Sequence, residues 1–235
     1  MAVILEKQRI ILKFEETVFT SAMRGIAESN KLDLSICSGE LVLVRLARLE
    51  QTAGFADACS GIFSPTRGRI FFLGRNWPEL APDQANALRG RIGRVFRTGN
   101  WINHLSLMEN ILLSQLHHTR RPARRLRDEA GKLAEQFGLP GLPLGLPGDF
   151  TEADLRRAAC VRAFLGRPLL ILLEEPTSGI YLEIISALMT AIREARERGA
   201  AVIWLTQKDL IWNDQTLPVN QRYRLASGKL MEMTT

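Results

Sequence analysis

The chain has 235 residues, of which 46% are hydrophobic and 24% charged, a composition ordinary for a cytosolic globular protein with one domain or a domain plus a subdomain. Its formal charge of +6 suits an anionic membrane surface, weak nucleic-acid binding, or an arginine-rich surface without a partner. No uncharged stretch reaches the ~20 residues that span a bilayer, and the start of the chain does not resemble a signal peptide, so we expect any membrane role to be peripheral. The cysteines lack metal-ligand spacing, and we expect Cys37, Cys59 and Cys160 to be reduced core residues.

The first part of the chain alternates short apolar runs with turns, which predicts a series of strands. Residues 2–20 are rich in Val, Ile, Leu and Phe in alternation, enough for one or two strands. Apolar and small residues at helical spacing predict a helix within 46–63. Further strands are predicted at 32–36, 41–44, 69–74 and 92–96.

The middle of the chain changes to a helical pattern. Apolar residues recur there at three- and four-residue intervals and define one helix face: Leu105, Met108, Ile111, Leu112 and Leu116. A basic, helix-prone segment follows over 117–132, and a Gly/Pro-rich connector over 138–148 predicts a loop. Thr151 or Asp149 is expected to cap a new helix over 152–165.

The last third of the chain returns to alternating strands and helices. Five apolar residues at 169–173 precede Glu174 and Glu175 and predict a strand buried on both faces of a parallel sheet, whose carboxyl end is where such sheets place ligands. The remaining elements predicted here are a helix over 183–198 that Gly199 stops, a buried strand over 201–205 and a closing hairpin over 222–231. The sum is an α/β chain with an all-helical insertion in its middle.

Seven segments, in this order, resemble the nucleotide-binding domain of ATP-binding cassette (ABC) proteins over about residues 10–232. They are the SGE turn at 38–40, PTRGRIFFLGR, IGRVF, LSLMENILL, RRAACVRAFLGRP, LLILLEEPTSG and SGKLME. The resemblance implies a P-loop NTPase-like (RecA-like) ABC ATPase fold in a single domain over 1–235. An α/β core with an antiparallel β subdomain is then expected at 1–97 and 166–235, and a helical subdomain at 98–165.

The phosphate-binding loop of the family, GxxxxGKST, falls on Leu46–Gly54 and is altered there. Such a loop works because glycines let backbone N–H groups converge on phosphates, a lysine adds charge and a hydroxyl binds Mg²⁺. Here Leu46 and Gln51 replace the glycines, Thr52 stands at the lysine position and Ala53 at the hydroxyl position, while Glu50 adds a negative charge. We therefore expect no cofactor, and ATP with Mg²⁺ only if this degenerate loop still binds them.

The other chemical motifs of the family are altered in the same way. Arg97 stands where the family has the glutamine of the Q-loop, Glu174 where it has the Walker B aspartate, and Gln207 where it has the switch histidine. The signature LSGGQ falls on Phe150–Asp154, with Thr151, Glu152 and Ala153 in its centre, and the D-loop at 178–181 lacks its aspartate. Glu175 alone keeps a catalytic identity, that of the general base. It either still polarises water or caps the following turn through backbone N–H groups, and we favour the cap.

In the family, the segment after the Q-loop and the helical subdomain form a groove for a coupling helix of a membrane subunit. By resemblance, that surface comprises Arg97, Trp101, Ile102, Leu105 and Met108, whose apolar character suits a groove. We therefore expect a catalytically degenerate ABC subunit, peripheral on the cytoplasmic face of the inner or plasma membrane. It would dock on a transmembrane permease and pair with a second ABC ATPase subunit or with a copy of itself. The helix at 155–163 is similar to that of Mla-type (MCE-associated) lipid transporter ATPases, which implies lipid or other hydrophobic cargo.

Two alternatives stay open. One is a weakly active ATPase that uses Glu175, with Arg48 or Arg97 in place of the lysine. The other is a soluble regulator or nucleic-acid binder that uses the basic run at 120–127, although a solvated helix face is favoured there and no nucleic acid is expected. A metal site is not expected either, because His104, His117 and His118 lack spaced carboxylate or thiol partners.

Overall fold

The computed structural model describes residues 9–19, 31–48, 50–62, 64–226 and 228–233. Within these ranges a small antiparallel sheet has the strand order β2-β1-β4-β5. Its strands are β1 (Ile10–Val18), β2 (Leu32–Cys37), β4 (Arg67–Phe72) and β5 (Arg75–Asn76). The strands predicted at 32–36 and 69–74 are therefore confirmed in position. Of the predicted strand region 2–20, the part before residue 9 lies outside the described residues.

A second sheet in the described chain has the order β10-β9-β3-β8-β7-β6. It comprises β3 (Leu41–Leu46), β6 (Ile92–Val95), β7 (Leu170–Glu174), β8 (Ala201–Thr206), β9 (Gln221–Ala226) and β10 (Lys229–Glu232). The pairs from β9 through β6 are parallel, and the predicted closing hairpin β9–β10 is antiparallel. The apolar runs predicted as doubly buried strands hold that place, since every residue of β7 and β8 is buried.

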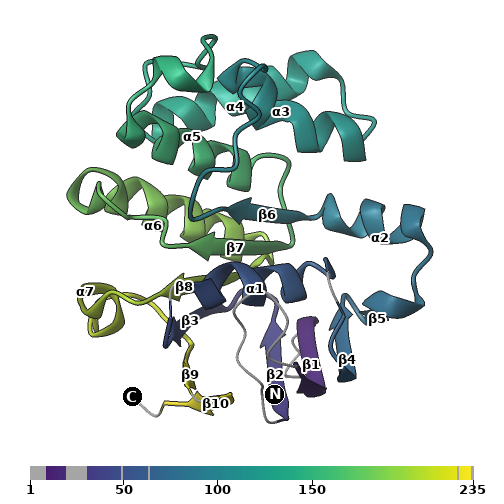
Figure 1. Ribbon diagram of the computed structural model, residues 1–235. Helices are drawn as coiled ribbons and strands as arrows, with labels where there is room; N and C mark the ends of the chain where they lie inside the picture. Colours follow the sequence, from purple (N-terminus) through teal and green to yellow (C-terminus); the bar gives the residue numbers. More distant parts are fainter. Residues whose placement is uncertain (1–8, 20–30, 49, 63, 227, 234–235) are drawn as a thin grey trace, which may run out of the picture.

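Alternate residues of the central strands pack into two cores, one on each face of the sheet. Leu43, Leu173 and Trp204 face a cluster that they share with the helices drawn above the sheet in Figure 1. Val44, Leu172 and Ile203 face a cluster shared with α1 (Glu50–Cys59) and the antiparallel sheet. The period of two along each strand thus places the carboxyl ends of β3, β7 and β8 between two packed layers.

Four further helices accompany the sheets. They are α2 (Pro82–Arg89), α6 (Tyr181–Glu197), the short α7 (Asp209–Trp212) and the 3₁₀ turn Trp77–Glu79. The helix predicted within 46–63 begins only at Glu50, because β3 runs on to Leu46 and a turn intervenes. Gly199, with φ of 88°, lies just beyond the end of α6, as expected for a glycine that stops a helix.

Three helices lie together at the top of Figure 1: α3 (Leu107–His118), α4 (Ala123–Gln136) and α5 (Glu152–Phe164). The predicted face of α3 was partly wrong. Leu116 is exposed and Leu105 precedes the helix, whereas the buried face includes Leu107, Ile111 and Gln115. The capping box of Ser106 with Glu109 starts the helix at Leu107, which leaves Leu105 outside it.

The boundaries around these helices follow local chemistry. The basic segment 117–132 does not continue one helix, because α3 ends at His118 and Pro122 precedes α4. The connector is irregular except for one 3₁₀ turn at Pro147–Asp149, and Thr151 caps α5 by accepting the backbone N–H of Asp154 at 3.1 Å. Asp149 instead accepts the backbone N–H of Leu146. The division into a core and a helical subdomain at 98–165 stays a prediction.

The cysteines differ in environment. Cys59 and Cys160 are buried, and burial raises the pKa of Cys160 to about 12, while Cys37 is partly exposed rather than a core residue. Cys37 ends β2, where the small sheet meets solvent. Across the described ranges, none of the helices combines the length and apolar character that a bilayer crossing requires.

Candidate functional site

Two backbone groups of the loop between β3 and α1 hydrogen-bond to side chains of this chain. Oε1 of Gln51 accepts the backbone N–H of Arg48 at 3.0 Å, and the carbonyl oxygen of Leu46 accepts Nε2 of Gln207 at 3.2 Å. Thr52, at the family's lysine position, is completely buried. Leu49 and the side chain of Glu50 lie outside the described residues. An amide oxygen thus occupies one backbone donor of the loop.

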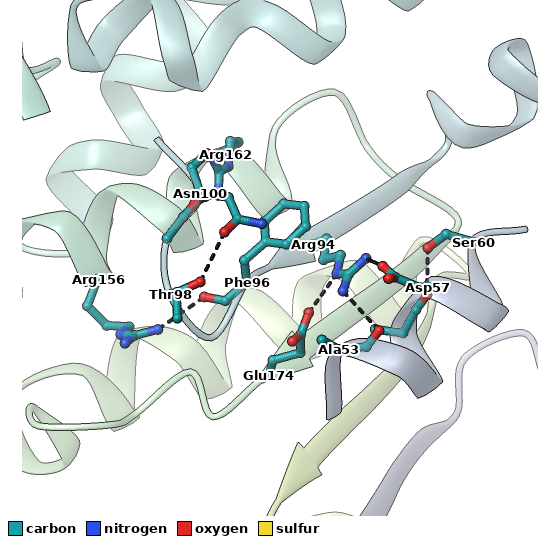
Figure 2. Close-up of polar contacts among 12 residues, drawn as sticks. Ala53, Asp57, Ser60, Arg94, Phe96, Thr98, Asn100, Arg156, Arg162 and Glu174 are labelled. Atoms are coloured by element: carbon teal, nitrogen blue, oxygen red, sulfur yellow. Dashed lines mark hydrogen bonds and ion pairs between the residues drawn. The ribbon is translucent and has the colours of Figure 1, made fainter. Parts of the chain in front are cut away.

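Arg94 holds two carboxylates at the edge of this loop, an arrangement that the sequence analysis missed (Figure 2). Its Nε lies 2.6 Å from Oε1 of Glu174 at the end of β7, and its Nη1 lies 2.6 Å from Oδ1 of Asp57 on α1. Its Nη2 also donates to the carbonyl oxygen of Ala53 at 3.3 Å. The guanidinium therefore joins β6, β7 and α1 at the sheet edge where the ligand was expected.

The three charged side chains are taken almost completely out of water. Arg94 is 10% exposed, Asp57 9% and Glu174 1%. Burial raises the pKa of Glu174, and the charge of Arg94 opposes that rise without cancelling it. In the sequence, Arg94 is visible only as one charge inside the strand IGRVF, and Asp57 only as one charge inside α1. Neither charge indicates its partner, because the partners lie 37 and 80 positions from Arg94.

Glu175 turns its carboxylate toward the end of β8. Oε1 accepts the backbone N–H of Gln207 at 2.6 Å, and Oε2 accepts the hydroxyl of Thr206 at 3.0 Å. The residue is 4% exposed and has φ of 46°, in the left-handed region. Glu175 was predicted to accept backbone N–H groups of the turn that follows it. That prediction was wrong, because the backbone N–H that it accepts belongs to Gln207. The structure thus brings together the loop, Glu174, Glu175 and Gln207 at one edge of the sheet.

The backbone of Arg97 hydrogen-bonds to Glu174, and Arg97 and the start of α5 line a groove of about 290 Å³ beside that edge. Its walls are Arg97, Thr98, Gly99, Trp101, Glu152, Leu155, Arg156 and Ala159. Of the predicted partner surface only Arg97 and Trp101 line it, and of the signature only Glu152. Ile102, Leu105 and Met108 are half-buried beside it, with Met108 packed on the core, because α3 begins beyond Leu105. Ala153 is also half-buried against the core.

Two arginines of α5 fix the backbone that forms this groove. Arg156 donates to the carbonyl oxygens of Phe96 and Arg97, at 3.3 and 3.1 Å. Arg162 donates to Gly99 at 2.5 Å and lies 4.2 Å from the ring centroid of Trp101. Burial lowers the pKa of Arg162 to about 10, which leaves it charged at neutral pH. The indole is therefore held by a cation–π contact that also keeps one ring face covered.

The chain is similar to known proteins in sequence. Residues 55–178 match a family model described as ABC transporter. The octopine permease ATP-binding protein P of Rhizobium meliloti is 29% identical over 127 residues, 54% of this chain and 48% of that protein. The glutamate/aspartate import ATP-binding protein GltL of Escherichia coli is 31% identical over 121 residues, 52% and 50% of the two chains. The chain spans about half the length of these curated relatives.

The fold is also that of a solved structure. The dimeric bacterial ABC transporter cassette MJ0796 superposes with a TM-score of 0.83 at 20% identity, over 95% of this chain and 98% of that one. Another structure of MJ0796 is described as a post-hydrolysis state bound to ADP and Pi. The α/β arrangement, with its antiparallel sheet and its group of helices, is therefore the ABC cassette fold.

Proposed function

Since the chain belongs to the ABC transporter family, we propose that it serves as a transporter subunit whose own nucleotide site is inactive, a pseudo-ATPase. The observation that carries this proposal is the clasp of Arg94 on Glu174 and Asp57. Glu174 stands where the family binds Mg²⁺, and here a guanidinium of the same chain already neutralises it. The carboxylate is thus occupied without any ligand.

A magnesium ion fits poorly beside this guanidinium. Two unit charges of the same sign 4 Å apart repel by about 4 kcal/mol at an effective dielectric constant of ~20, and a divalent ion roughly doubles that. Oxygen ligands with net negative charge are what Mg²⁺ requires, and Arg94 cancels half of the two carboxylates' charge. The residues present therefore do not fit a Mg²⁺–triphosphate.

The loop argues in the same direction. A phosphate site needs free backbone N–H groups and a lysine, whereas Gln51 holds the N–H of Arg48 and Thr52 is buried at the lysine position. The match to the family model begins at residue 55, immediately after this loop. Sequence similarity to the family is therefore retained in the segment that follows the altered loop.

The groove at Trp101 supports a role in assembly. We place the docking of a permease's cytoplasmic helix there, with the chain on the cytoplasmic face of the membrane and paired with an ATPase subunit or with its own copy. The division into an α/β core and a helical subdomain over 98–165 belongs to the same proposal. The relatives are named for octopine and for glutamate/aspartate, so polar cargo competes with the lipid cargo implied by the helix at 155–163.

The direct test titrates the purified protein with a fluorescent ATP analogue and Mg²⁺. We expect no saturation in the micromolar range, and we expect no gain for Arg94→Gln, because the loop is altered independently. Micromolar binding by the unmodified protein contradicts the proposal. Hydrolysis that Glu175→Gln abolishes would instead establish the weakly active ATPase.

A second experiment tests assembly and cargo. Where a neighbouring reading frame encodes a permease, that permease is co-expressed with this chain and purified, and the chain that is retained on it is measured. Trp101→Ala should weaken retention, whereas Leu182→Ala, at an 87% exposed position on α6, should not. Equal retention of both variants argues against the groove. Uptake of labelled amino acids or phospholipid by the complex in vesicles then distinguishes the two cargo classes.

A further inference from the structure

A pocket of about 660 Å³ lies at the amino-terminal ends of β6 and β7, whereas Glu174 lies at the carboxyl end of β7. The ends of α2 and α3 and the turn before β7 enclose it, through Gly90, Gln115 and Gly166. Because Leu169 precedes β7 and Glu174 ends it, the two sites are separated by the length of one strand, roughly 15 Å. The volume falls within the ~300–1,000 Å³ typical of small-molecule sites.

Three arginines line this pocket: Arg75, Arg91 and Arg167. Among the described residues, its walls include no carboxylate, and none of the three guanidiniums forms an ion pair. The one side-chain contact recorded for them is a 3.3 Å hydrogen bond from Arg75 to Oε1 of Gln84. Elsewhere in the chain, Arg94, Arg121 and Arg157 are each paired with acids. The side chains of Arg75, Arg91 and Arg167 are all exposed, so the mouth of the pocket concentrates positive charge that no carboxylate of its described walls neutralises.

The walls of the pocket carry a net positive charge. The carboxyl ends of α2 and α3 each contribute roughly half a negative elementary charge, which offsets about one of the three arginines. Arg167 also borders a second pocket lined by Asp128, Glu129 and Glu194, which offsets part of its charge. His118 adds nothing at neutral pH, because burial, together with the charges of His117 and Arg89, lowers its pKa. A phosphomonoester carries about −1.5 to −2 at pH 7 and is the matching anion.

The remaining walls provide one polar group and an apolar surface. Gln115 is 6% exposed, and within the described chain its Oε1 accepts no hydrogen bond while its Nε2 makes only a 3.5 Å contact to Gly90. Oε1 is covered by the protein, so the group that the amide offers to a ligand is the N–H of Nε2. Leu80, Leu88 and Leu169 form the apolar side. Nε2 has only this long contact, so a ligand that accepts its N–H would improve the pairing of the buried side chain.

We propose that this pocket binds a phosphomonoester, with its dianion held by Arg75, Arg91 and Arg167 and its carbon part packed on the leucines. Guanidinium groups suit this ligand, because their paired N–H groups match two phosphate oxygens. The amide of Gln115 hydrogen-bonds the ester or a neighbouring hydroxyl. The ligand is either a soluble phosphate ester or the headgroup of a phosphatidic-acid type lipid.

The test is isothermal titration calorimetry with phenyl phosphate, using benzyl alcohol as the uncharged comparison. Arg91→Gln/Arg167→Gln should weaken phenyl phosphate binding at least tenfold. The matched control is Arg124→Gln/Arg127→Gln, which removes the same charge from exposed positions on α4. Circular dichroism of each variant checks the fold. Absence of saturable binding, or equal weakening by both pairs, overturns the proposal, because the latter would indicate non-specific attraction.

A second arm identifies the source of the phosphate. Vesicles of phosphatidylcholine with and without phosphatidic acid are sedimented with the protein. The ligand is a lipid headgroup if the protein sediments only with vesicles that contain phosphatidic acid. The Arg91→Gln/Arg167→Gln variant should then lose this binding, whereas the Arg124→Gln/Arg127→Gln variant should keep it. Phenyl phosphate binding without this vesicle binding assigns a soluble ester. Binding of benzyl alcohol as strongly as phenyl phosphate contradicts the site, because the arginines would then contribute nothing.

Discussion

Nε of Arg94 lies 2.6 Å from Oε1 of Glu174, although 80 positions separate the two residues in the chain. The same guanidinium reaches Asp57, so one side chain joins the strand β6, the end of β7 and the helix α1 (Figure 2). Its position over the ring of Phe96, at 4.4 Å from the centroid, adds a cation–π contact. The clasp therefore stabilises the packing of α1 on the sheet as well as neutralising the carboxylates.

Removal of this cation should destabilise the protein strongly. Arg94→Gln leaves Glu174 and Asp57 buried without their counter-charge, and breaking a buried pair in this way costs about 3–5 kcal/mol. Urea unfolding followed by circular dichroism measures the loss. Arg97→Gln, a half-buried position with no ion pair among the described residues, should change the free energy of unfolding by less than ~0.5 kcal/mol. If both variants lose the same stability, the clasp contributes nothing special.

The cost of Arg94→Gln should also depend on pH. Burial raises the pKa of Glu174 above its ordinary 4.5 even with Arg94 present, so the folded protein holds a proton there that the unfolded chain has released. The stabilisation that Glu174 contributes through this bound proton is thus complete below pH ~4.5, and it is lost as the pH rises through the folded-state pKa. Without Arg94 that pKa rises further, and the loss should be larger at pH 8 than at pH 5. Arg94→Gln/Glu174→Gln should lack this difference, and urea midpoints at both pH values test it.

Glu175 should behave as an acceptor for the end of β8. Glu175→Ala leaves the backbone N–H of Gln207 and the hydroxyl of Thr206 without their partners, which costs about 1–3 kcal/mol for a buried group. Glu175→Gln keeps one oxygen acceptor and should lose less than half as much. Thermal unfolding of the three proteins in parallel gives the comparison. Equal losses would mean that the negative charge, rather than the acceptor, is what β8 requires.

The strands at the centre of the fold could be predicted because burial on both faces leaves a direct trace in the sequence. Leu170–Glu174 and Ala201–Thr206 are continuous apolar runs for that reason, and Gly199 marks a helix end through its positive φ. The order of the family's segments then implied the ABC cassette fold, to which the comparison with MJ0796 agrees. Local pattern and chain order were sufficient for the scaffold.

The contacts of the site could not be predicted in the same way. Arg94 is one charge in a short strand, and its partners become neighbours only when β6 pairs with β7 and α1 packs against the sheet. Glu175 likewise reaches Gln207 because β7 and β8 are adjacent, so the backbone N–H it accepts was assigned to the wrong segment. The start of α3 was predicted wrongly for a local reason, since the cap at Ser106 leaves Leu105 before the helix. Long-range pairing and cap chemistry are both invisible to apolar periodicity.

Ser106 should determine the stability of the start of α3. Its hydroxyl accepts the N–H of Glu109 at 3.2 Å, and Glu109 accepts the backbone N–H of Ser106 at 2.8 Å. Ser106→Ala should cost about 1 kcal/mol, as other cap deletions do. The hydrogen bond from Ser106 also lowers the pKa of Glu109, so this stabilisation is present above pH ~4.5 and is lost as the pH falls through the folded-state pKa. The difference between the two proteins should shrink accordingly in acid denaturation. A difference that is constant with pH contradicts the role of Glu109.

Gly93 marks the closest approach of β6 to α5. A Cβ at this position would lie 1.8 Å from the carbonyl oxygen of Ala163, a backbone atom that cannot move without shifting α5. Gly93→Ala should therefore destabilise the protein by about 1–3 kcal/mol or more, as overpacking does. Gly131→Ala is the matched control, because a Cβ there meets nothing within 4 Å and Gly131 lies inside α4. That change should stabilise the protein by about 0.5–1 kcal/mol. Stabilisation by both substitutions would show that α5 and β6 do not pack as closely as the geometry requires.

The same substitution should also affect the groove at Trp101, because α5 carries Arg156 and Arg162, which hold the groove. Gly93→Ala should loosen it and so increase the quenching of Trp101 fluorescence by acrylamide.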